Sequence, residues 1–171
     1  MECARFSFEG PRGAVRCAGV ALGQAATAGA VIALEGPLGA GKTTLTQSIA
    51  RGLAVPVEQR VTSPTFAIVL RHAGRVALYH ADLYRLASVH DVDELGLFAQ
   101  SEDGVLVIEW PERASARMPA DVLWIELERV APLRRRLSLR ATGPSSADLV
   151  HSVETAITAR EALMELGRRA R

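Results

Sequence analysis

The sequence predicts an α/β fold with parallel strands at the centre of one sheet, antiparallel strands extending it, and helices on both faces. Three observations support this. Residues 31–34 and 105–108 are short, continuously apolar runs, as expected for parallel strands buried on both faces. A glycine-rich loop and a helical pattern follow the first run directly. Residues 122–127 and 136–140 alternate between apolar and polar side chains, which is typical of antiparallel strands.

Length and composition indicate one globular domain. The chain has 171 residues, of which 49% are apolar and 23% are charged, and these values are ordinary for globular proteins. A formal net charge of +1 excludes a strong overall attraction to nucleic acid or membranes. The cysteines, Cys3 and Cys17, form no C-x-x-C pair and no disulfide framework, which favours a reducing compartment.

The sequence predicts neither a secretory signal nor a membrane segment. The first ten residues carry three charged side chains, which a signal peptide would not have. The longest weakly polar stretch, residues 25–34, is too short to cross a bilayer. We therefore expect a cytoplasmic protein that does not bind membranes.

The first third of the chain predicts two strands and two helices. In chain order these are an edge strand, an alanine-rich helix, a buried strand and a second helix: residues 4–9, 13–28, 31–34 and 42–53. Leu45, Ile49 and Leu53 recur at helical spacing in the last of them. The order of strand, glycine-rich loop and helix makes the loop a credible ligand site.

The remainder predicts a hairpin, a short helix, three strands and a long helix. In chain order these are residues 66–70 and 76–80 around a turn at 72–75, then 91–98, 105–108, 122–127, 136–140 and 148–169. The run Arg134-Arg135-Arg136 is expected to be a solvated group of charges. Val153, Ile157, Leu163 and Met164 are expected on the apolar side of the last helix.

The glycine-rich loop carries the strongest chemical signal. It matches G-x-x-x-x-G-K-[ST], the phosphate-binding P-loop, in Gly36-Pro37-Leu38-Gly39-Ala40-Gly41-Lys42-Thr43. The glycines let backbone N–H groups point inward around an anion, and the following helix adds its positive end. Lys42 would reach the β- and γ-phosphates, and the Thr43 hydroxyl would bind Mg²⁺. The sequence therefore predicts a P-loop NTPase fold.

Polar side chains follow two other predicted strands. Glu109 ends the apolar run at residues 105–108, at the sheet edge where open α/β sheets bind ligands. It is a natural partner of Mg²⁺, either directly or through water, although a surface glutamate is the alternative. Asp82 would bind the metal or orient the attacking water, or else only cap a turn. For His80, a structural hydrogen bond is as well supported as a catalytic role.

A short loop and one aromatic residue complete the candidate site. Thr62-Ser63-Pro64-Thr65 lies between the P-loop helix and the next strand, where nucleotide switches sense the γ-phosphate. A simple proline turn is the alternative for this segment. Trp110 follows Glu109 directly and either stacks near the nucleotide or packs in the core.

The ordered set of motifs resembles the bacterial TsaE (YjeE) family over about residues 13–142. The set consists of Gly-Pro-Leu-Gly-Ala-Gly-Lys-Thr-Thr at 36–44, Ser-Pro-Thr-Phe at 63–66, His-Ala-Asp-Leu-Tyr-Arg at 80–85, Glu-Leu-Gly-Leu at 94–97 and Ile-Glu-Trp-Pro-Glu at 108–112. The resemblance implies an ATPase required for the threonylcarbamoyl modification of adenosine next to the tRNA anticodon. It further implies action with the proteins TsaB and TsaD, of which TsaD performs the transfer, and only indirect contact with tRNA.

The resemblance also implies roles for individual residues. By position, Lys42, Asp82 and Glu109 would be catalytic, Thr43 and Glu109 would serve Mg²⁺, and residues 62–65 would be switch-like. ATP would be bound by Gly36, Pro37, Leu38, Gly39, Ala40, Gly41, Lys42, Thr43, Thr44 and Trp110. We therefore expect a P-loop ATPase domain over residues 1–143 and a C-terminal helical extension over residues 144–171, packed on or beside the same domain.

Three other functions are open to a chain with a P-loop. A stand-alone small-molecule kinase usually needs an arginine-bearing lid, to which only residues 113–117 offer a match. A GTPase needs a lysine in its N-K-x-D guanine reader, but Lys42 is the only lysine of the chain. A nucleotide-gated binding module, in which ATP turnover is incidental, overlaps with the function of an ATPase that serves a tRNA-modifying complex. Because the sequence offers no clear arginine finger, we expect slow ATP hydrolysis in the isolated protein and activation by a partner.

Overall fold

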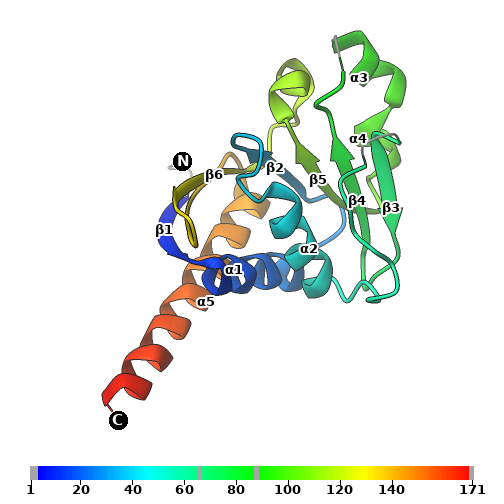
Figure 1. Ribbon diagram of the computed structural model, residues 1–171. Helices are drawn as coiled ribbons and strands as arrows, with labels where there is room; N and C mark the ends of the chain where they lie inside the picture. Colours follow the sequence, from blue (N-terminus) through cyan, green and yellow to red (C-terminus); the bar gives the residue numbers. More distant parts are fainter. Residues whose placement is uncertain (1–3, 65–66, 87–88, 170–171) are drawn as a thin grey trace.

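The computed structural model describes residues 4–64, 67–86 and 89–169 (Figure 1). Within these residues, seven strands form one sheet in the order β1-β7-β6-β2-β5-β4-β3. The strands are β1 (Arg5–Pro11), β2 (Val31–Glu35), β3 (Val69–His72), β4 (Ala77–Asp82), β5 (Gly104–Glu109), β6 (Leu123–Ala131) and β7 (Arg134–Ala141). The helices are α1 (Arg12–Ala25), α2 (Lys42–Gly52), α3 (Val89–Leu95), α4 (Leu97–Gln100), the 3-10 helix η1 (Pro111–Arg117) and α5 (Pro144–Arg169).

The centre of the sheet is parallel, as the sequence predicts. Strand β2 pairs in parallel with β5 on one side and with β6 on the other, and β4 pairs in parallel with β5. Antiparallel strands extend the centre at both edges: β7 and then β1 beyond β6, and β3 beyond β4. One expectation is corrected in part, because β6 is antiparallel only to β7. Its alternating pattern reflects one buried and one exposed face, not the direction of its neighbours.

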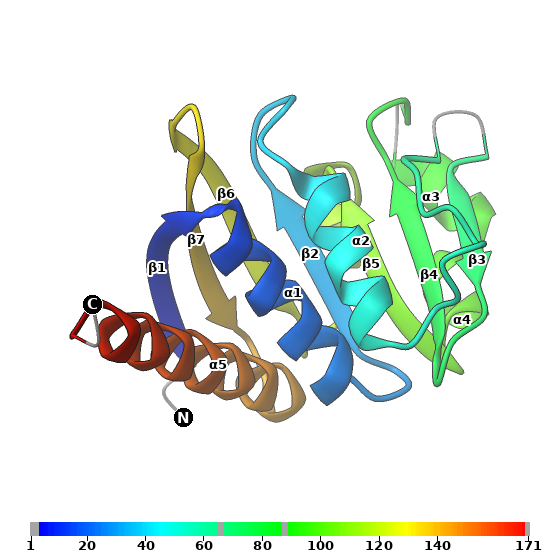
Figure 2. The same ribbon diagram turned by 60° about the horizontal axis from the view of Figure 1, so that its bottom comes forward.

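Helices cover the two faces of the sheet unequally. The longer helices α1, α2 and α5 lie together on one face (Figure 2), where their apolar side chains pack with Ile32 and Leu34 of β2. The short helices α3, α4 and η1 contribute to a second core on the other face, with Val31 and Ala33. Successive residues of β2 thus enter different cores, which is why its sequence is continuously apolar.

Helices α1 and α2 approach each other very closely at two glycines. A Cβ atom added to Gly23 would lie 2.1 Å from the carbonyl oxygen of Ile49, and one added to Gly52 would lie 2.3 Å from that of Val20. No larger residue fits at either position without moving the backbone. This contact fixes α2 against the rest of the domain, and α2 begins at the P-loop lysine.

Helix α5 begins earlier than the sequence pattern indicates, at Pro144. Proline is well placed in a first helical turn, since its missing N–H has no helical partner there. The Asp121 carboxylate accepts hydrogen bonds from the backbone N–H groups of Ser145 and Ser146 at 2.8 and 3.0 Å. A carboxylate from the segment before β6 therefore satisfies the start of α5 and ties it to the sheet.

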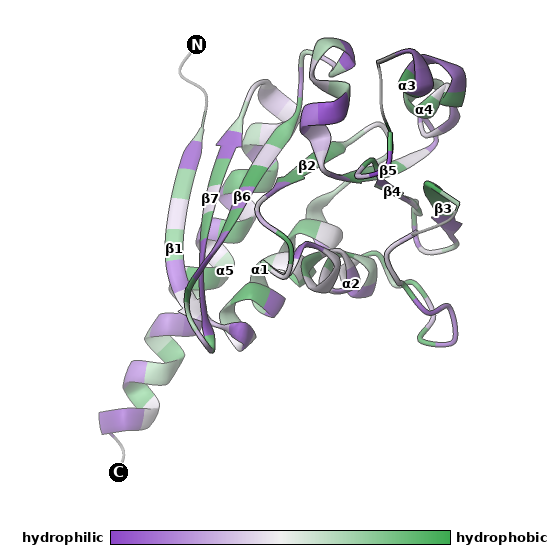
Figure 3. Ribbon diagram, turned by 45° about the horizontal axis from the view of Figure 1, so that its top comes forward, coloured by the Kyte–Doolittle hydropathy of each residue, from purple (hydrophilic) through white to green (hydrophobic). Residues whose placement is uncertain are grey.

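The second half of α5 leaves the domain surface (Figure 1). Val153 and Ile157 are buried as expected, but Leu163 and Met164 are 70% and 49% exposed. The apolar side of α5 is therefore buried at Val153 and Ile157 and largely uncovered at Leu163 and Met164, because the helix extends past the edge of the sheet. Polar and apolar residues alternate along this projecting part (Figure 3).

Two local boundaries also differ from the sequence-based expectation. The helix expected at residues 91–98 is two short helices, because Gly96 adopts a left-handed conformation between them, with φ of 55°. The hairpin is present, but its first strand begins at Val69, and Phe66 lies outside the described residues. In the described ranges, no helix is long and apolar enough to cross a membrane.

Candidate functional site

The P-loop connects β2 to α2 and depends on its glycines. Gly36, Gly39 and Gly41 have φ angles of 136°, 78° and 113°, values that residues with a Cβ atom rarely adopt. A Cβ atom on Gly36 would also lie 2.5 Å from the carbonyl oxygen of Leu127. Helix α2 begins immediately after Gly41, so its positive end faces this loop. The loop has the backbone that the sequence motif requires.

Lys42 bends back over the loop it follows. Its Nζ donates hydrogen bonds to the carbonyl oxygens of Gly36 at 2.6 Å and Pro37 at 3.2 Å. It also lies 3.8 Å from the ring centre of Trp110. Burial lowers the pKa of Lys42, while the nearby carboxylates, first Glu109, oppose that shift. The only ammonium of a lysine side chain in the chain is thus held at the P-loop.

Glu109 lies at the carboxyl end of β5 and is almost completely buried. Its Oε1 accepts a hydrogen bond from the Thr43 hydroxyl at 2.9 Å and lies 2.9 Å from Nε2 of His80. In the sheet register, Glu109 lies beside Leu34 of β2 and Asp82 of β4. The parallel arrangement therefore brings both predicted carboxylates and the P-loop to one edge of the sheet.

Asp82 is joined to the predicted switch-like loop. Its Oδ2 accepts a hydrogen bond from the Ser63 hydroxyl at 2.5 Å, and its Oδ1 accepts one from the backbone N–H of Tyr84 at 3.1 Å. Thr62 and Pro64 flank Ser63 in an irregular segment, as expected, whereas Thr65 lies outside the described residues. A direct contact therefore links the loop to the sheet edge.

Trp110 lies beside the P-loop lysine. It has a φ of 61°, an unusual value for a residue with a large side chain. Its ring centre is 5.0 Å from that of Tyr84, which is itself 57% exposed. Of the two placements that the sequence left open, the one near the phosphate-binding loop agrees with this geometry. The contact with Tyr84 was not anticipated, since nothing in the spacing of the two residues signals it.

A cavity of about 240 Å³ adjoins the P-loop and includes an arginine that sequence reasoning missed. The cavity is lined by Gly39, Ala40, Gly41, Thr44, Arg12, Val15 and Arg135. Arg135 Nε donates a 2.7 Å hydrogen bond to the carbonyl oxygen of Ala40. The neighbouring Arg134 and Arg136 form exposed ion pairs, as expected of a solvated run. Arg135 differs from them in its contact with the P-loop, which no local sequence pattern reveals.

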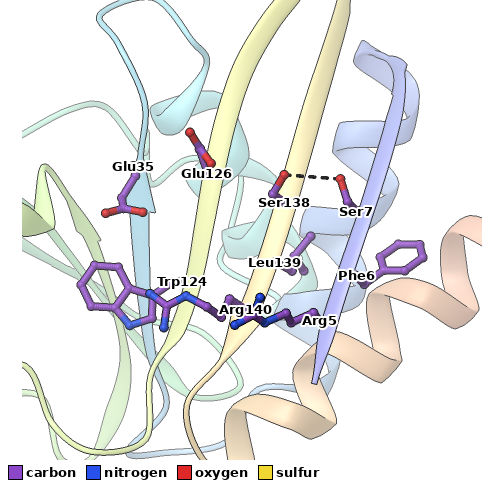
Figure 4. A pocket seen from close by; sticks show the side chains of 9 residues that line it. All are labelled: Arg5, Phe6, Ser7, Glu35, Trp124, Glu126, Ser138, Leu139 and Arg140. Atoms are coloured by element: carbon purple, nitrogen blue, oxygen red, sulfur yellow. Dashed lines mark hydrogen bonds between the residues drawn. The ribbon is translucent and has the colours of Figure 1, made fainter. Parts of the chain in front are cut away.

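A second cavity of about 360 Å³ lies on the sheet face away from α1, α2 and α5 (Figure 4). Strands β1, β7, β6 and β2 line it, and it contains none of the predicted nucleotide-binding residues. Glu35 and Glu126 lie side by side there in the register of β2 and β6. Burial, and then the charge of Glu126, raises the pKa of Glu35. Although larger, this cavity does not contain the P-loop chemistry.

The oxygen atoms at the P-loop edge fit a magnesium–nucleotide complex. Mg²⁺ takes oxygen ligands and in nucleotide sites needs only one or two from the protein, with phosphates and waters supplying the rest. The Thr43 hydroxyl and the Glu109 carboxylate are 2.9 Å apart, so both can face one ion. Within the described ranges, no cluster of three or more His, Cys, Asp and Glu side chains offers a metal site made by protein alone.

Comparison with known proteins agrees with this arrangement. The family model described as threonylcarbamoyl adenosine biosynthesis protein TsaE matches residues 12–137, most of the chain. The chain belongs to the TsaE family. The match includes every candidate site residue and ends within β7, before α5. The resemblance inferred from the ordered motifs is therefore confirmed.

Relatives named tRNA threonylcarbamoyladenosine biosynthesis protein TsaE cover most of this TsaE-family chain. The one from Treponema pallidum is 38% identical over 124 residues, which are 71% of this chain and 89% of the relative. The one from Mycobacterium tuberculosis H37Rv is 39% identical over 137 residues, which are 74% of this chain and 80% of the relative.

A solved structure supports the same fold. The crystal structure of Bacillus subtilis YdiB superimposes with a TM-score of 0.71 at 25% sequence identity. The superposition covers 91% of this chain and 97% of YdiB. The predicted α/β fold, with a parallel centre and antiparallel extensions, is therefore confirmed for this TsaE-family chain.

Proposed function

We propose that this chain is a Mg²⁺-dependent ATPase that supports threonylcarbamoyladenosine modification of tRNA next to the anticodon. It acts in the cytoplasm with the TsaB–TsaD complex and meets tRNA only indirectly. The observation that carries the proposal is the contact of Thr43 with Glu109 at the mouth of a P-loop, in a chain of the TsaE family. That contact supports the proposal, because a magnesium nucleotide bound to a P-loop needs a hydroxyl and a carboxylate close together.

The P-loop would hold the phosphates of ATP. Its backbone N–H groups and the positive end of α2 attract phosphate oxygens. Lys42 would exchange the carbonyl oxygens of Gly36 and Pro37 for phosphate oxygens. Burial lowers the pKa of Lys42. The negative charge of bound ATP would oppose that shift and stabilise the ammonium form.

Thr43 and Glu109 would hold Mg²⁺, and Asp82 would orient the attacking water. When bound, the ion neutralises charge on the β- and γ-phosphate oxygens. Ser63 donates to Asp82, so the switch-like loop would respond to whatever Asp82 contacts. A γ-phosphate would then favour one arrangement of residues 62–64, and its loss would release that arrangement.

One geometric observation counts against a stand-alone kinase. The segment that would supply arginines to a lid is η1, which packs beside α3. Arg117 of η1 donates two hydrogen bonds to the Asp93 carboxylate, at 2.6 and 2.8 Å. One of the two arginines of residues 113–117 is thus already paired with an acidic side chain of α3, whereas a lid arginine must reach the substrate.

The test is an ATPase assay of the purified chain with and without purified TsaB–TsaD, combined with a pull-down in ATP and in ADP. We expect slow hydrolysis alone, stimulation by TsaB–TsaD and a nucleotide-dependent association. GTP should be a poor substrate, since the chain lacks a second lysine for a guanine reader. Rapid hydrolysis by the isolated protein that TsaB–TsaD leave unchanged would contradict the proposal.

A further inference from the structure

His80 is a buried polar side chain for which the proposed mechanism has so far had no use. It lies near the end of β4, two residues before Asp82, and is completely inaccessible to solvent. Its Nε2 lies 2.9 Å from Oε1 of Glu109. Its Nδ1 is also buried and, among the described residues, has no hydrogen-bond partner. One nitrogen of the ring thus contacts the proposed metal-binding carboxylate, and the other has no hydrogen-bond partner in the described part of the chain.

We propose that His80 is a positioning residue: its Nε2–H donates to Glu109 and holds that carboxylate in the orientation that binds the magnesium nucleotide. The inference rests on the proposed function, since it concerns the same site. It assigns a role to a side chain that would otherwise count as ordinary core.

The geometry shows which ring nitrogen of His80 would donate. An ionised carboxylate only accepts hydrogen bonds, so the contact with Glu109 places the ring proton on Nε2. The contact therefore assigns the donor role to Nε2, while Nδ1 has no hydrogen-bond partner among the described residues.

Packing alone does not account for a histidine at this position. A buried nitrogen without a partner costs free energy, and an aliphatic side chain of similar size would avoid that cost. The neighbours of His80 on the same face of the sheet, such as Leu78 and Val107, are apolar and fully buried. The contact that distinguishes His80 from such a residue is the one with Glu109.

Thr43 and His80 share the same oxygen of Glu109, and this sharing suggests how the roles divide. In the proposed mechanism the Thr43 hydroxyl would serve Mg²⁺, so it would no longer restrain Glu109. His80 would then be the donor that keeps Oε1 in place and directs Oε2 toward the nucleotide. Groups behind metal ligands commonly act in this way, and their loss weakens metal affinity by about 10- to 100-fold.

The experiment measures how Mg²⁺ changes the affinity for ADP, by calorimetry, in wild type and in His80→Leu, His80→Gln and His80→Asn. The amide nitrogen of Gln reaches about as far as Nε2 of His, whereas that of Asn is too short. His72→Leu is the matched control, because His72 is also buried with one unpartnered nitrogen but makes no contact with Glu109. Circular dichroism melts check that each variant is folded.

We expect all folded variants to bind ADP without Mg²⁺ as the wild type does. His80→Leu and His80→Asn should need about 10- to 100-fold more Mg²⁺ to strengthen ADP binding. His80→Gln should recover most of the wild-type response, and His72→Leu should keep all of it. If His80→Leu does not fold, the contrast between Gln and Asn decides, since both are polar amides.

A wild-type Mg²⁺ response in His80→Leu or His80→Asn would overturn the positioning role. So would a defect in His80→Gln equal to that of His80→Asn. These outcomes leave the proposed function standing, because the wild type would still bind the magnesium nucleotide. A wild-type protein that binds no nucleotide with or without Mg²⁺ would instead refute the proposed function, and the inference with it.

Discussion

Charged side chains are held differently at the P-loop edge and at the antiparallel edge that β6, β7 and β1 form in the same sheet. At the P-loop edge, Lys42 and Glu109 are 5% and 3% exposed. At the antiparallel edge, Arg136 of β7 pairs with Glu128 of β6 and Glu9 of β1, and these side chains are 38–47% exposed. Buried ions need compensating interactions, whereas exposed pairs are screened by water and add little to stability. Burial therefore distinguishes the group that we propose to serve nucleotide chemistry from the solvated pairs.

The largest expected effect is that of Lys42→Ala. The substitution removes the only ammonium that can meet the phosphates, so ATP hydrolysis should fall by about 100-fold or more. Equilibrium binding of ATP and the steady-state rate measure the loss. If both remain at wild-type values, the buried lysine would be structural, and the contrast between the two edges would fail.

Glu109→Ala should come next, with turnover about 100-fold lower while the fold is retained. The variant loses the carboxylate that contacts Thr43 and His80. Hydrolysis rates in a Mg²⁺ series, with a thermal melt as the control for folding, test this. A wild-type hydrolysis rate in this variant would mean that Glu109 is an ordinary acidic residue at the end of a strand, without a role in turnover.

Thr43→Ala should have a smaller and more selective effect. It removes one hydroxyl ligand, so nucleotide affinity in Mg²⁺ should fall by about tenfold, the value of one hydrogen bond to a charged group. Affinity in EDTA should change much less. Titrations of ADP under both conditions separate the two effects, and equal losses would mean that Thr43 does not serve the metal.

The smallest effect is expected at the antiparallel edge. Arg136→Ala breaks exposed ion pairs to Glu9 and Glu128 and should destabilise the protein by about 0–1 kcal/mol. Its ATPase rate should match the wild type. Urea unfolding and the hydrolysis assay check these points, and a large loss of activity would show that the two edges are coupled.

Much of the fold follows from local sequence patterns. The observed structure differs from the expected one where segments far apart in the chain meet. The apolar run at residues 105–108 predicts a buried strand because both of its faces are covered. The alternation at residues 122–127 predicts one exposed face, but it does not reveal that β6 runs parallel to β2. Leu163 and Met164 have the spacing of packed residues and yet lie on the part of α5 that projects from the domain. Periodicity shows which face is apolar, not whether anything covers it.

The candidate site likewise combines features that local sequence determines with contacts that depend on the tertiary structure. By itself, the sequence determined the P-loop and the strands that carry Asp82 and Glu109, because the glycine conformations and strand ends are local properties of the chain. Only the tertiary structure decided that His80 and Thr43 share one oxygen of Glu109 and that Arg135 reaches the loop. Those contacts depend on strand register and helix placement, which join residues far apart in the chain.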